Sequence, residues 1–149
     1  MTLAIRPLRP GDRDPWRRLY DGYHRFYERP DLPAAFFDAA FARLMSGDAR
    51  DFHGLVAEAD GRLLGLTHYV FHPNLWRPEG VCYLQDLFTA PEARGQGVAR
   101  ALIEGVYAAA DAAGVPAVYW LTAETNYPGR MLYDRVAVKS PFIRYNRAP

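Results

Sequence analysis

The sequence predicts a single α+β domain that spans the whole chain, 1–149, with about four helices flanking a mixed, mostly antiparallel sheet. Three observations favour this class. The dipeptide Asp60-Gly61 joins two runs with strand periodicity, which is a hairpin signal. An apolar run at 81–89, a helical stretch and a second apolar run at 116–124 follow one another, as in a crossover between parallel strands. The chain is also long enough to bury one core.

The first third of the chain has the pattern of one strand followed by two helices. Residues 3–8 (LAIRPL) predict a short strand, which Pro10-Gly11 closes. Residues 31–47 (DLPAAFFDAAFARLMSG) predict the second helix, with a glycine beyond its end. The first helix begins near a capping residue at Asp12 or Asp14 and carries an aromatic stripe at helical spacing, which is typical of a buried face: Trp16, Leu19, Tyr20, Tyr23 and Tyr27.

The rest of the chain has the pattern of several strands around one long helix. Residues 54–59 and 62–70 predict the hairpin, and 81–89 (VCYLQDLFT) is apolar enough for a central strand. The long helix is predicted from Val98 to Gly114. The nearly continuous apolar run at 116–124 predicts a strand covered on both faces. A short helix at 128–135 and a last strand at 138–145 complete the expected fold.

Composition and charge exclude several classes of protein. The formal net charge is +1, so no broad field attracts nucleic acid or an anionic membrane. No apolar stretch reaches membrane-spanning length, and the first residues show no cleavage-like site. Cys82 is the single cysteine, so no intrachain disulfide can form and a reducing compartment is expected. We therefore predict a cytoplasmic protein without nucleic-acid or membrane partners.

Residues 89–102 (TAPEARGQGVARAL) place two glycines at the start of the long helix. Glycine inside a helix costs about 1 kcal/mol relative to alanine, so these positions need another explanation. The first N–H groups of a helix are free to bind an anion, and Gly95 and Gly97 remove side chains that would keep a phosphate away from them. Arg94 adds positive charge. The alternative is a tight turn without a ligand, because the segment fits neither the P-loop nor the G-x-G-x-x-G fingerprint.

The spacing Arg94-x-x-Gly97-x-Ala99 resembles the acetyl-coenzyme A signature of the GNAT acetyltransferase superfamily, Arg/Gln-x-x-Gly-x-Gly/Ala. The context is similar as well, with YLQDLFT before the loop and Asn126 followed by LYDR after it. YLQDLFTAPEARGQG resembles spermidine/spermine acetyltransferases, and VYWLTAETN with the segments after it resembles the yeast group that acetylates D-amino acids, polyamines or histone tails. The resemblance implies the GNAT fold with a sheet splayed at the cofactor site, acetyl-CoA as the acetyl donor, and a homodimer.

The resemblance also implies which residues hold the cofactor. The strand before the loop pairs with the pantetheine arm, and the loop amides hold the pyrophosphate. Two departures from the family pattern are Ala137-Val138, in place of a Gly-aromatic pair, and Pro128-Gly129, in place of a plain helical start. The implied cofactor-binding residues are Leu87, Phe88, Thr89, Arg94, Gly95, Gln96, Gly97, Val98, Ala99, Arg100, Asn126, Arg130 and Tyr133.

Acetyl transfer to an amine requires a neutral nucleophile, a polarised thioester carbonyl and a proton for the leaving thiolate. The resemblance implies that Tyr133 stands near the thioester sulfur, and we predict it as the general acid; the alternative is a core tyrosine. A backbone N–H near Leu87 or Phe88 is the simplest donor to the carbonyl oxygen. Asp86 is the candidate base, with a structural acceptor as the alternative, and Glu124 is the second candidate.

The acceptor side is expected where the first two helices cover the sheet, as in the family. An aromatic stripe at helical spacing is more often core than ligand-binding, because one face of a helix must point inward. His68 and His72 are expected on one strand face, at the border or rim of the acceptor cleft. His24, His53 and these two lack metal-ligand spacing, so no metal site is expected. The candidate substrate-binding residues are Tyr23, Tyr27, Glu28, Gln85, Asp86 and Glu124.

The favoured function is an acetyl-CoA-dependent N-acetyltransferase that modifies a primary amine of a small molecule, amino acid or polyamine-like, by direct attack in a ternary complex. Gln85-Asp86 carries one acid where polyamine-acetylating relatives carry two, which weakens a polycationic substrate. The alternatives are acetylation of a protein lysine or N-terminus, a non-catalytic acetyl-CoA sensor, and an unrelated phosphate-binding module. Thiol release with a panel of amines distinguishes an enzyme from a sensor, and a phosphate-binding module would bind nucleotides without pantetheine equally well.

Overall fold

The computed structural model describes residues 2–149, which form a five-stranded sheet in the order β1-β2-β3-β4-β5. Strands β1 to β4 pair antiparallel with their sequence neighbours, and β5 pairs parallel with β4. The predicted mixed α+β architecture is therefore confirmed. The strands are β1 (Ala4–Pro7), β2 (His53–Ala59), β3 (Arg62–Asn74), β4 (Arg77–Thr89) and β5 (Val118–Tyr119).

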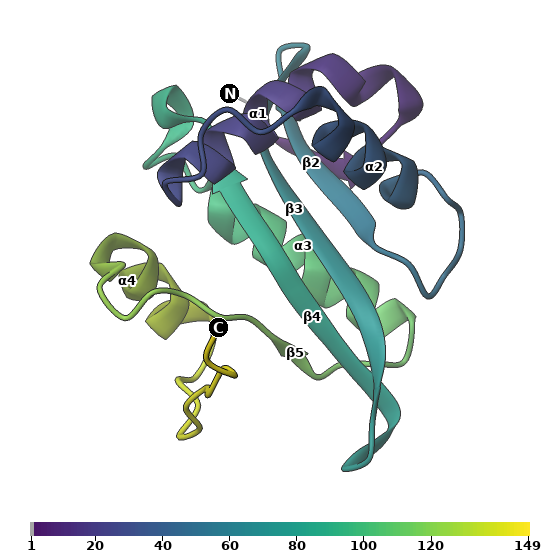
Figure 1. The fold of residues 1–149 in the computed structure, drawn as a ribbon, viewed down its shortest axis with the longest axis vertical. Coiled ribbons are helices and arrows are strands. Elements are labelled where there is room, and N and C mark those ends of the chain that lie inside the picture. The colour runs from purple at the N-terminus through teal and green to yellow at the C-terminus, as the bar shows by residue number, and fades with distance from the viewer. Residues whose placement is uncertain (1) are drawn as a thin grey trace.

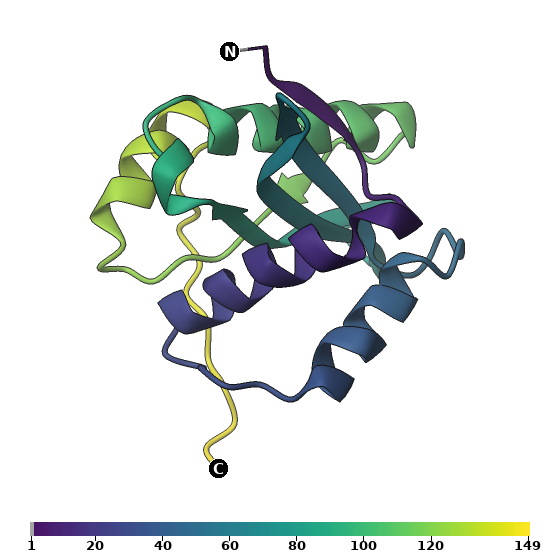
Figure 2. The same cartoon turned by 90° about the horizontal axis from the view of Figure 1, so that it is seen from above.

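Helices cover both faces of this sheet (Figures 1 and 2). Helices α1 (Arg13–Phe26) and α2 (Ala34–Leu44) lie on one face, and α3 (Val98–Ala112) lies on the other. Helix α4 (Tyr127–Val136) follows β5 and lies to the side of the sheet. All four predicted helices are present. Within the described chain, none of them is long and apolar enough to cross a membrane.

The core fixes α1 and α3 against the sheet. Trp16 and Tyr20 of α1 are 1% and 6% exposed, and Phe37 of α2 packs edge-on against the Trp16 ring. Leu102 and Val106 of α3 are fully buried on the opposite face. Full burial of one large apolar side chain stabilises a fold by about 1.5–3 kcal/mol. Val98, in the first turn of α3, is buried as well, so the helix start that follows the glycine-containing loop is held on the sheet.

Strands β3 and β4 are longer than predicted and meet in a second hairpin. They extend to Asn74 and back to Arg77, so that the two strands project beyond the rest of the sheet as an arm (Figure 1). Leu75 and Trp76 form its exposed tip. Prolines at positions 73 and 78 obscured this arm in the sequence, because proline ordinarily interrupts a strand ladder and is tolerated only at edges.

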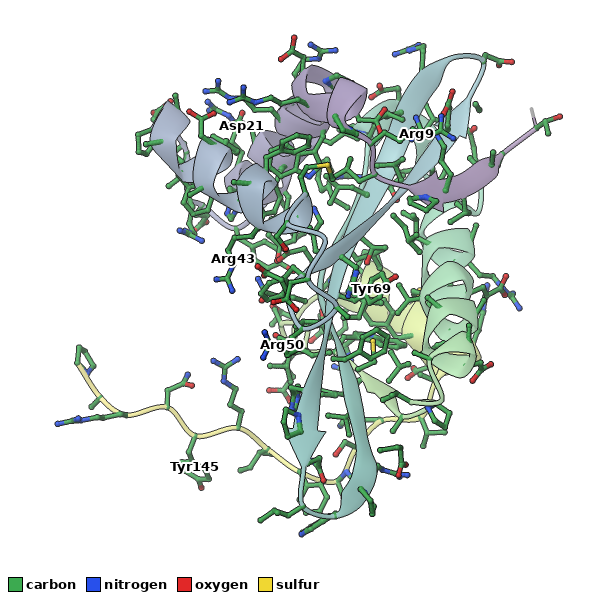
Figure 3. All side chains as sticks on the ribbon, turned by 90° about the vertical axis from the view of Figure 1, so that its right-hand side faces the viewer. Arg9, Asp21, Arg43, Arg50, Tyr69 and Tyr145 are labelled. Carbon is green, nitrogen blue, oxygen red and sulfur yellow. The ribbon has the colours of Figure 1, made fainter. Side chains whose placement is uncertain are left out.

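The two C-terminal strand predictions fail in large part. Of the predicted strand 116–124, only Val118–Tyr119 pairs with β4, so the run is not a strand covered on both faces. The predicted strand 138–145 is irregular in the structure. Pro141 has no N–H to donate to a ladder, and the segment leads away from the sheet, with Tyr145 projecting from it (Figure 3).

Candidate active site

Strand β4 has a neighbour on its β5 side along only part of its length. Cys82 and Tyr83 of β4 pair with β5, and no further pair follows. Beyond Tyr83, residues 84–89 keep β3 on one side, while the chain that follows β5 turns toward α4 (Figure 1). Backbone N–H and C=O groups on the free side of a strand are ready to pair with an extended partner. The predicted splay of the sheet at this strand is therefore present.

A β-bulge in β4 coincides with this divergence. Tyr69 of β3 lies opposite Leu84, and His68 lies opposite Asp86, so Gln85 is an extra residue in β4. A bulge bends its strand and increases the local twist. It thus provides a local cause for the departure of β4 from β5. The run VCYLQDLFT gives no sequence signal of it, because the bulged residue is an ordinary polar one.

The loop between β4 and α3 leaves open space beside the free edge of β4. Gly95 and Gly97 have φ angles of +77° and +82°, in the left-handed region, and a Cβ at either position would meet nothing within 4 Å. Gly97 precedes α3, whose N-terminus has no side-chain cap. The Arg94 guanidinium lies 5.8 Å from the centre of the Phe88 ring. Open N–H groups beside an arginine suit an anionic group such as a diphosphate.

A cavity of about 830 Å³ joins this loop to α1 and α4. The Thr89 hydroxyl oxygen is buried and has no hydrogen-bond partner within residues 2–149, which is an unsatisfied group that a ligand can satisfy. Ten predicted site residues line the cavity: Tyr23, Tyr27, Glu28, Leu87, Phe88, Thr89, Arg94, Ala99, Asn126 and Tyr133.

Helix α4 places Tyr133 in this cavity. The ring packs edge-on against Trp120, with centroids 5.5 Å apart. Burial, and to a smaller extent the nearby Tyr27, raise the pKa of Tyr133 above its ordinary value of 10. The hydroxyl is therefore protonated at neutral pH, as a general acid must be before it acts.

Asn126 has a structural role at the same wall, because it caps α4. Its Oδ1 accepts a hydrogen bond from the Gly129 backbone N–H at 3.4 Å, and its Nδ2 donates to Thr122. A Cβ at Gly129 would lie 2.5 Å from Nδ2 of Asn126, so glycine permits this cap. Pro128 occupies the first turn, where proline is tolerated. The departure Pro128-Gly129 from the family pattern thus leaves the helix intact.

Several predicted residues lie outside the cavity. Glu124 and Arg130 border a separate hollow of about 490 Å³ beside the C-terminal segment, where Arg130 donates to the Glu124 carbonyl oxygen at 2.6 Å. Gln85 and Asp86 border a smaller cavity of about 300 Å³ beneath α2. Five more predicted residues do not line the cavity and lie instead in the loop and the first turn of α3: Gly95, Gln96, Gly97, Val98 and Arg100.

Asp86 is buried on the α1 side of the sheet, with 3% of its surface exposed. Its Oδ2 accepts hydrogen bonds from the Tyr20 hydroxyl at 2.9 Å and from Nδ1 of His68 at 2.8 Å. Burial raises the pKa of Asp86, but hydrogen bonds, above all the one from His68, lower it further than burial raises it. The carboxyl group is therefore ionised at neutral pH and enclosed by donors, away from the cavity that contains Tyr133.

His68 lies deeper than the sequence suggested. It is 3% exposed beneath α1, whereas a position at the border or rim of the cleft was expected. The Trp16 indole N–H donates to Nε2 of His68 at 2.9 Å. His72 does lie at the surface, where it bonds the Tyr119 hydroxyl at 2.8 Å. The pairing of His68 with Asp86 depends on strand register, so no local sequence signal reveals it. The described residues contain no cluster of three potential metal ligands.

Comparison with known proteins agrees with this geometry. Residues 16–137 match the Acetyltransferase (GNAT) family. The D-amino-acid N-acetyltransferase HPA3 of Saccharomyces cerevisiae is 34% identical over 146 residues, which cover 97% of this chain and 90% of that protein. A ribosomal-protein-alanine N-acetyltransferase from Brucella melitensis biovar Abortus 2308 has a TM-score of 0.82 at 22% identity, over 99% of both chains.

A second solved structure, AAC(6')-Iy in complex with a CoA-linked bisubstrate analogue, has a TM-score of 0.85 at 20% identity and covers 100% of this chain and 99% of its own. The chain belongs to the GNAT acetyltransferase family. It is an N-acetyltransferase, and acetyl-CoA is the donor that this family uses.

We expect Gly97→Val to weaken acetyl-CoA binding by about 10-fold or more, measured by isothermal titration calorimetry. The new side chain would fill the open space before the α3 amides and would be strained at a φ of +82°. Gly114→Val is the matched control, because Gly114 has a φ of +73°, also with nothing within 4 Å, at the other end of α3. Equal effects of the two changes would contradict a role for the loop in binding.

Proposed function

We propose that this chain transfers the acetyl group of acetyl-CoA to a primary amine of a small molecule, by direct attack in a ternary complex. The observation that carries the proposal is one cavity that joins the free β4 edge at residues 87–89 to Tyr133 and to the end of α1, at Tyr23, Tyr27 and Glu28. The yeast relative is named for activity on D-amino acids, so amino acids are the first acceptors to consider.

In this proposal the main chain holds most of the donor. The amides of the pantetheine arm would pair with the free side of β4 at residues 84–89, and the diphosphate would lie on the amides of residues 95–99 beside Arg94. A β4 N–H near Leu87 or Phe88 would donate to the thioester oxygen, where negative charge develops during attack. The unpaired edge, the space before the loop and the unsatisfied Thr89 hydroxyl support this assignment.

The chemical step then needs few side chains. The amine nitrogen bonds to the carbonyl carbon and the carbon–sulfur bond breaks. Tyr133 gives its proton to the departing sulfur, and the proton released by the amine returns to Tyr133 through water. Glu28 is a carboxylate at the cavity wall and would bind a cationic group of the acceptor. Glu124 lies outside this cavity, which favours Glu28 over Glu124 as the acidic contact.

Release of free CoA with a panel of amines tests the substrate class. The panel contains D- and L-amino acids, polyamines, and short peptides with a free N-terminus or a lysine. We expect amino acids to give the highest kcat/KM, because the yeast relative is named for activity on D-amino acids. Acceptance of peptides alone would replace the small-molecule proposal with protein acetylation. Binding of acetyl-CoA without any thiol release would contradict turnover.

We expect Tyr133→Phe to lower kcat by about 100-fold while leaving the Kd of acetyl-CoA within about twofold, because general acid catalysis contributes 10²–10⁴-fold. Because the pKa of Tyr133 is raised above 10, loss of the acid by deprotonation should reduce the wild-type kcat only above about pH 10. Tyr83→Phe is the control, since burial also raises the pKa of Tyr83, which packs on β5 through Tyr119. An unchanged kcat for Tyr133→Phe would contradict the role of Tyr133 as the general acid.

We also propose that two copies associate through the C-terminal segment, residues 138–149. Val138, Phe142, Ile143 and Tyr145 are 74–93% exposed, far more than apolar side chains of this size usually are. The Phe142 ring contacts Trp76 at the tip of the β3–β4 arm, with centroids 6.3 Å apart. The adjoining strand β5 ends the sheet, so its outer edge is available to a segment of a second copy.

The double change Phe142→Ser with Ile143→Ser should convert a dimer into a monomer in sedimentation equilibrium, because it removes two exposed apolar side chains from the segment. Met131→Ser serves as the control, since Met131 is 63% exposed on α4 and lies outside the segment. A wild-type chain that sediments as a monomer would refute the association.

A further inference from the structure

A second cavity lies beneath α2, separate from the one that contains Tyr133. Its volume is about 300 Å³, and it shares no lining residue with the larger cavity. Much of its wall is apolar and comes from Phe36, Ala40, Leu44 and Phe52. Apolar cavities of roughly 300–1,000 Å³ bind small molecules, and a few polar groups in the wall decide which ones. The polar residues of this cavity therefore indicate the chemistry of its ligand.

Asp86 places a carboxylate at this cavity. It lines the wall together with Tyr20 and His68, the two residues whose hydrogen bonds hold the carboxylate. Both bonds reach Oδ2, and within residues 2–149 no hydrogen bond reaches Oδ1. Oδ1 is also not among the fully enclosed polar atoms that lack a partner, so accessible space reaches it. One oxygen of a nearly buried carboxylate is thus free to accept a hydrogen bond from a ligand.

The imidazole that holds Asp86 does not neutralise it. The indole N–H of Trp16 can only donate, so Nε2 of His68, 2.9 Å away, accepts and carries no proton. The proton of the imidazole therefore lies on Nδ1, which donates to Asp86 at 2.8 Å. His68 is neutral in this arrangement, so it supplies a hydrogen bond but no positive charge.

The arginines in this region have other partners. Arg43 lines the cavity, but its side chain is 64% exposed and bonds Asp51 at 3.0 Å (Figure 3). Arg29 bonds Nδ1 of His24 at 3.3 Å and does not line the cavity. Within residues 2–149, neither arginine forms an ion pair with Asp86. A buried charge is costly when no opposite charge accompanies it, so Asp86 would stabilise a cation in this cavity.

We propose that the cavity beneath α2 binds a small organic cation, an ammonium group on a short apolar stem. The ammonium would donate to Oδ1 of Asp86, and the stem would lie against Phe36 and Phe52. Gln85, the extra residue of the β4 bulge, also lines the cavity, and its amide oxygen can accept a second hydrogen bond. The site goes beyond the proposed acetylation, because it lies outside the cavity assigned to that reaction.

NMR signals of the indole N–H groups test the site in the absence of acetyl-CoA. The three tryptophans lie in different places: Trp16 bonds His68 behind Asp86, Trp120 packs on Tyr133, and Trp76 lies at the exposed tip of the β3–β4 arm. Titration with n-butylammonium chloride should shift the Trp16 signal, because its hydrogen bond leads to Asp86. The signals of Trp76 and Trp120 should stay in place.

A neutral probe separates binding of the charge from binding of the stem. 1-Butanol, with sodium chloride added to equal ionic strength, should need a concentration at least about 10-fold higher for the same Trp16 shift, because hydrogen bonds to a charged group are the stronger ones. Equal effects of the two probes would overturn the inference. A shift of the Trp120 signal alone would overturn it as well, since the amine would then occupy the other cavity.

Two variants test the carboxylate and the cavity separately. Asp86→Asn removes the charge and should raise the Kd of n-butylammonium about 10-fold or more. Ala40→Leu fills the cavity without altering a polar group and should weaken binding by a similar factor. Ala35→Leu is the matched control, because Ala35 is exposed on the same helix and does not line the cavity. If Asp86→Asn does not fold, unchanged affinity in Ala40→Leu still overturns the inference.

Acetylation kinetics distinguish two sources of the cation. Lysine carries a terminal ammonium that norleucine lacks. If Ala40→Leu lowers kcat/KM about 10-fold for lysine and less than about twofold for norleucine, the cation is the side chain of the acceptor. Equal kcat/KM changes, with weakened n-butylammonium binding, identify a separate small cation, and both results support the site. A wild-type chain that acetylates no amine refutes the proposed function, whereas the Trp16 signal still decides whether the site exists.

Discussion

The divergence of β4 from β5 is the constraint on which the rest of this molecule depends. Two pairs hold the strands together, and a bulge at Gln85 then turns β4 away. A continuous parallel pair would satisfy its own backbone groups and leave none for a ligand. The open strand instead borders the cavity at residues 87–89, and the glycine-containing loop follows directly. A single irregularity in one strand therefore places backbone donors, loop amides and Tyr133 around the same space.

The bent strand has different environments on its two faces. Leu87 and Thr89 line the cavity, whereas Asp86 points beneath α1 toward donors from two elements, Tyr20 of α1 and His68 of β3. Burying a charge costs several kcal/mol unless hydrogen bonds compensate, and here His68 and Tyr20 supply them. The same bonds tie α1 across β3 and β4, so α1 reaches the cavity with Tyr23 and Tyr27 in fixed positions. Stability and the polarity of the cavity wall thus come from one cluster.

The structural features that depend on local sequence pattern were predicted well from the sequence. The hairpin at Asp60-Gly61, the four helices and the loop glycines were found because turn residues and helical periodicity are short-range signals. The last strand was wrong because alternation at 138–145 predicts strand geometry without showing whether a neighbouring strand exists. For the candidate site, the family resemblance brought together ten residues that line one cavity. It did not predict that Asp86 lies outside that cavity or that His68 is buried rather than at the rim of a cleft. Both placements depend on the register between β3 and β4.

Amide hydrogen exchange with and without acetyl-CoA measures most directly whether the open strand edge and the loop hold the donor. The account predicts slower exchange on binding for amides on the free side of residues 84–89 and for residues 95–99, with little change in β2. Strong binding of acetyl-CoA with unchanged exchange in both segments would contradict it.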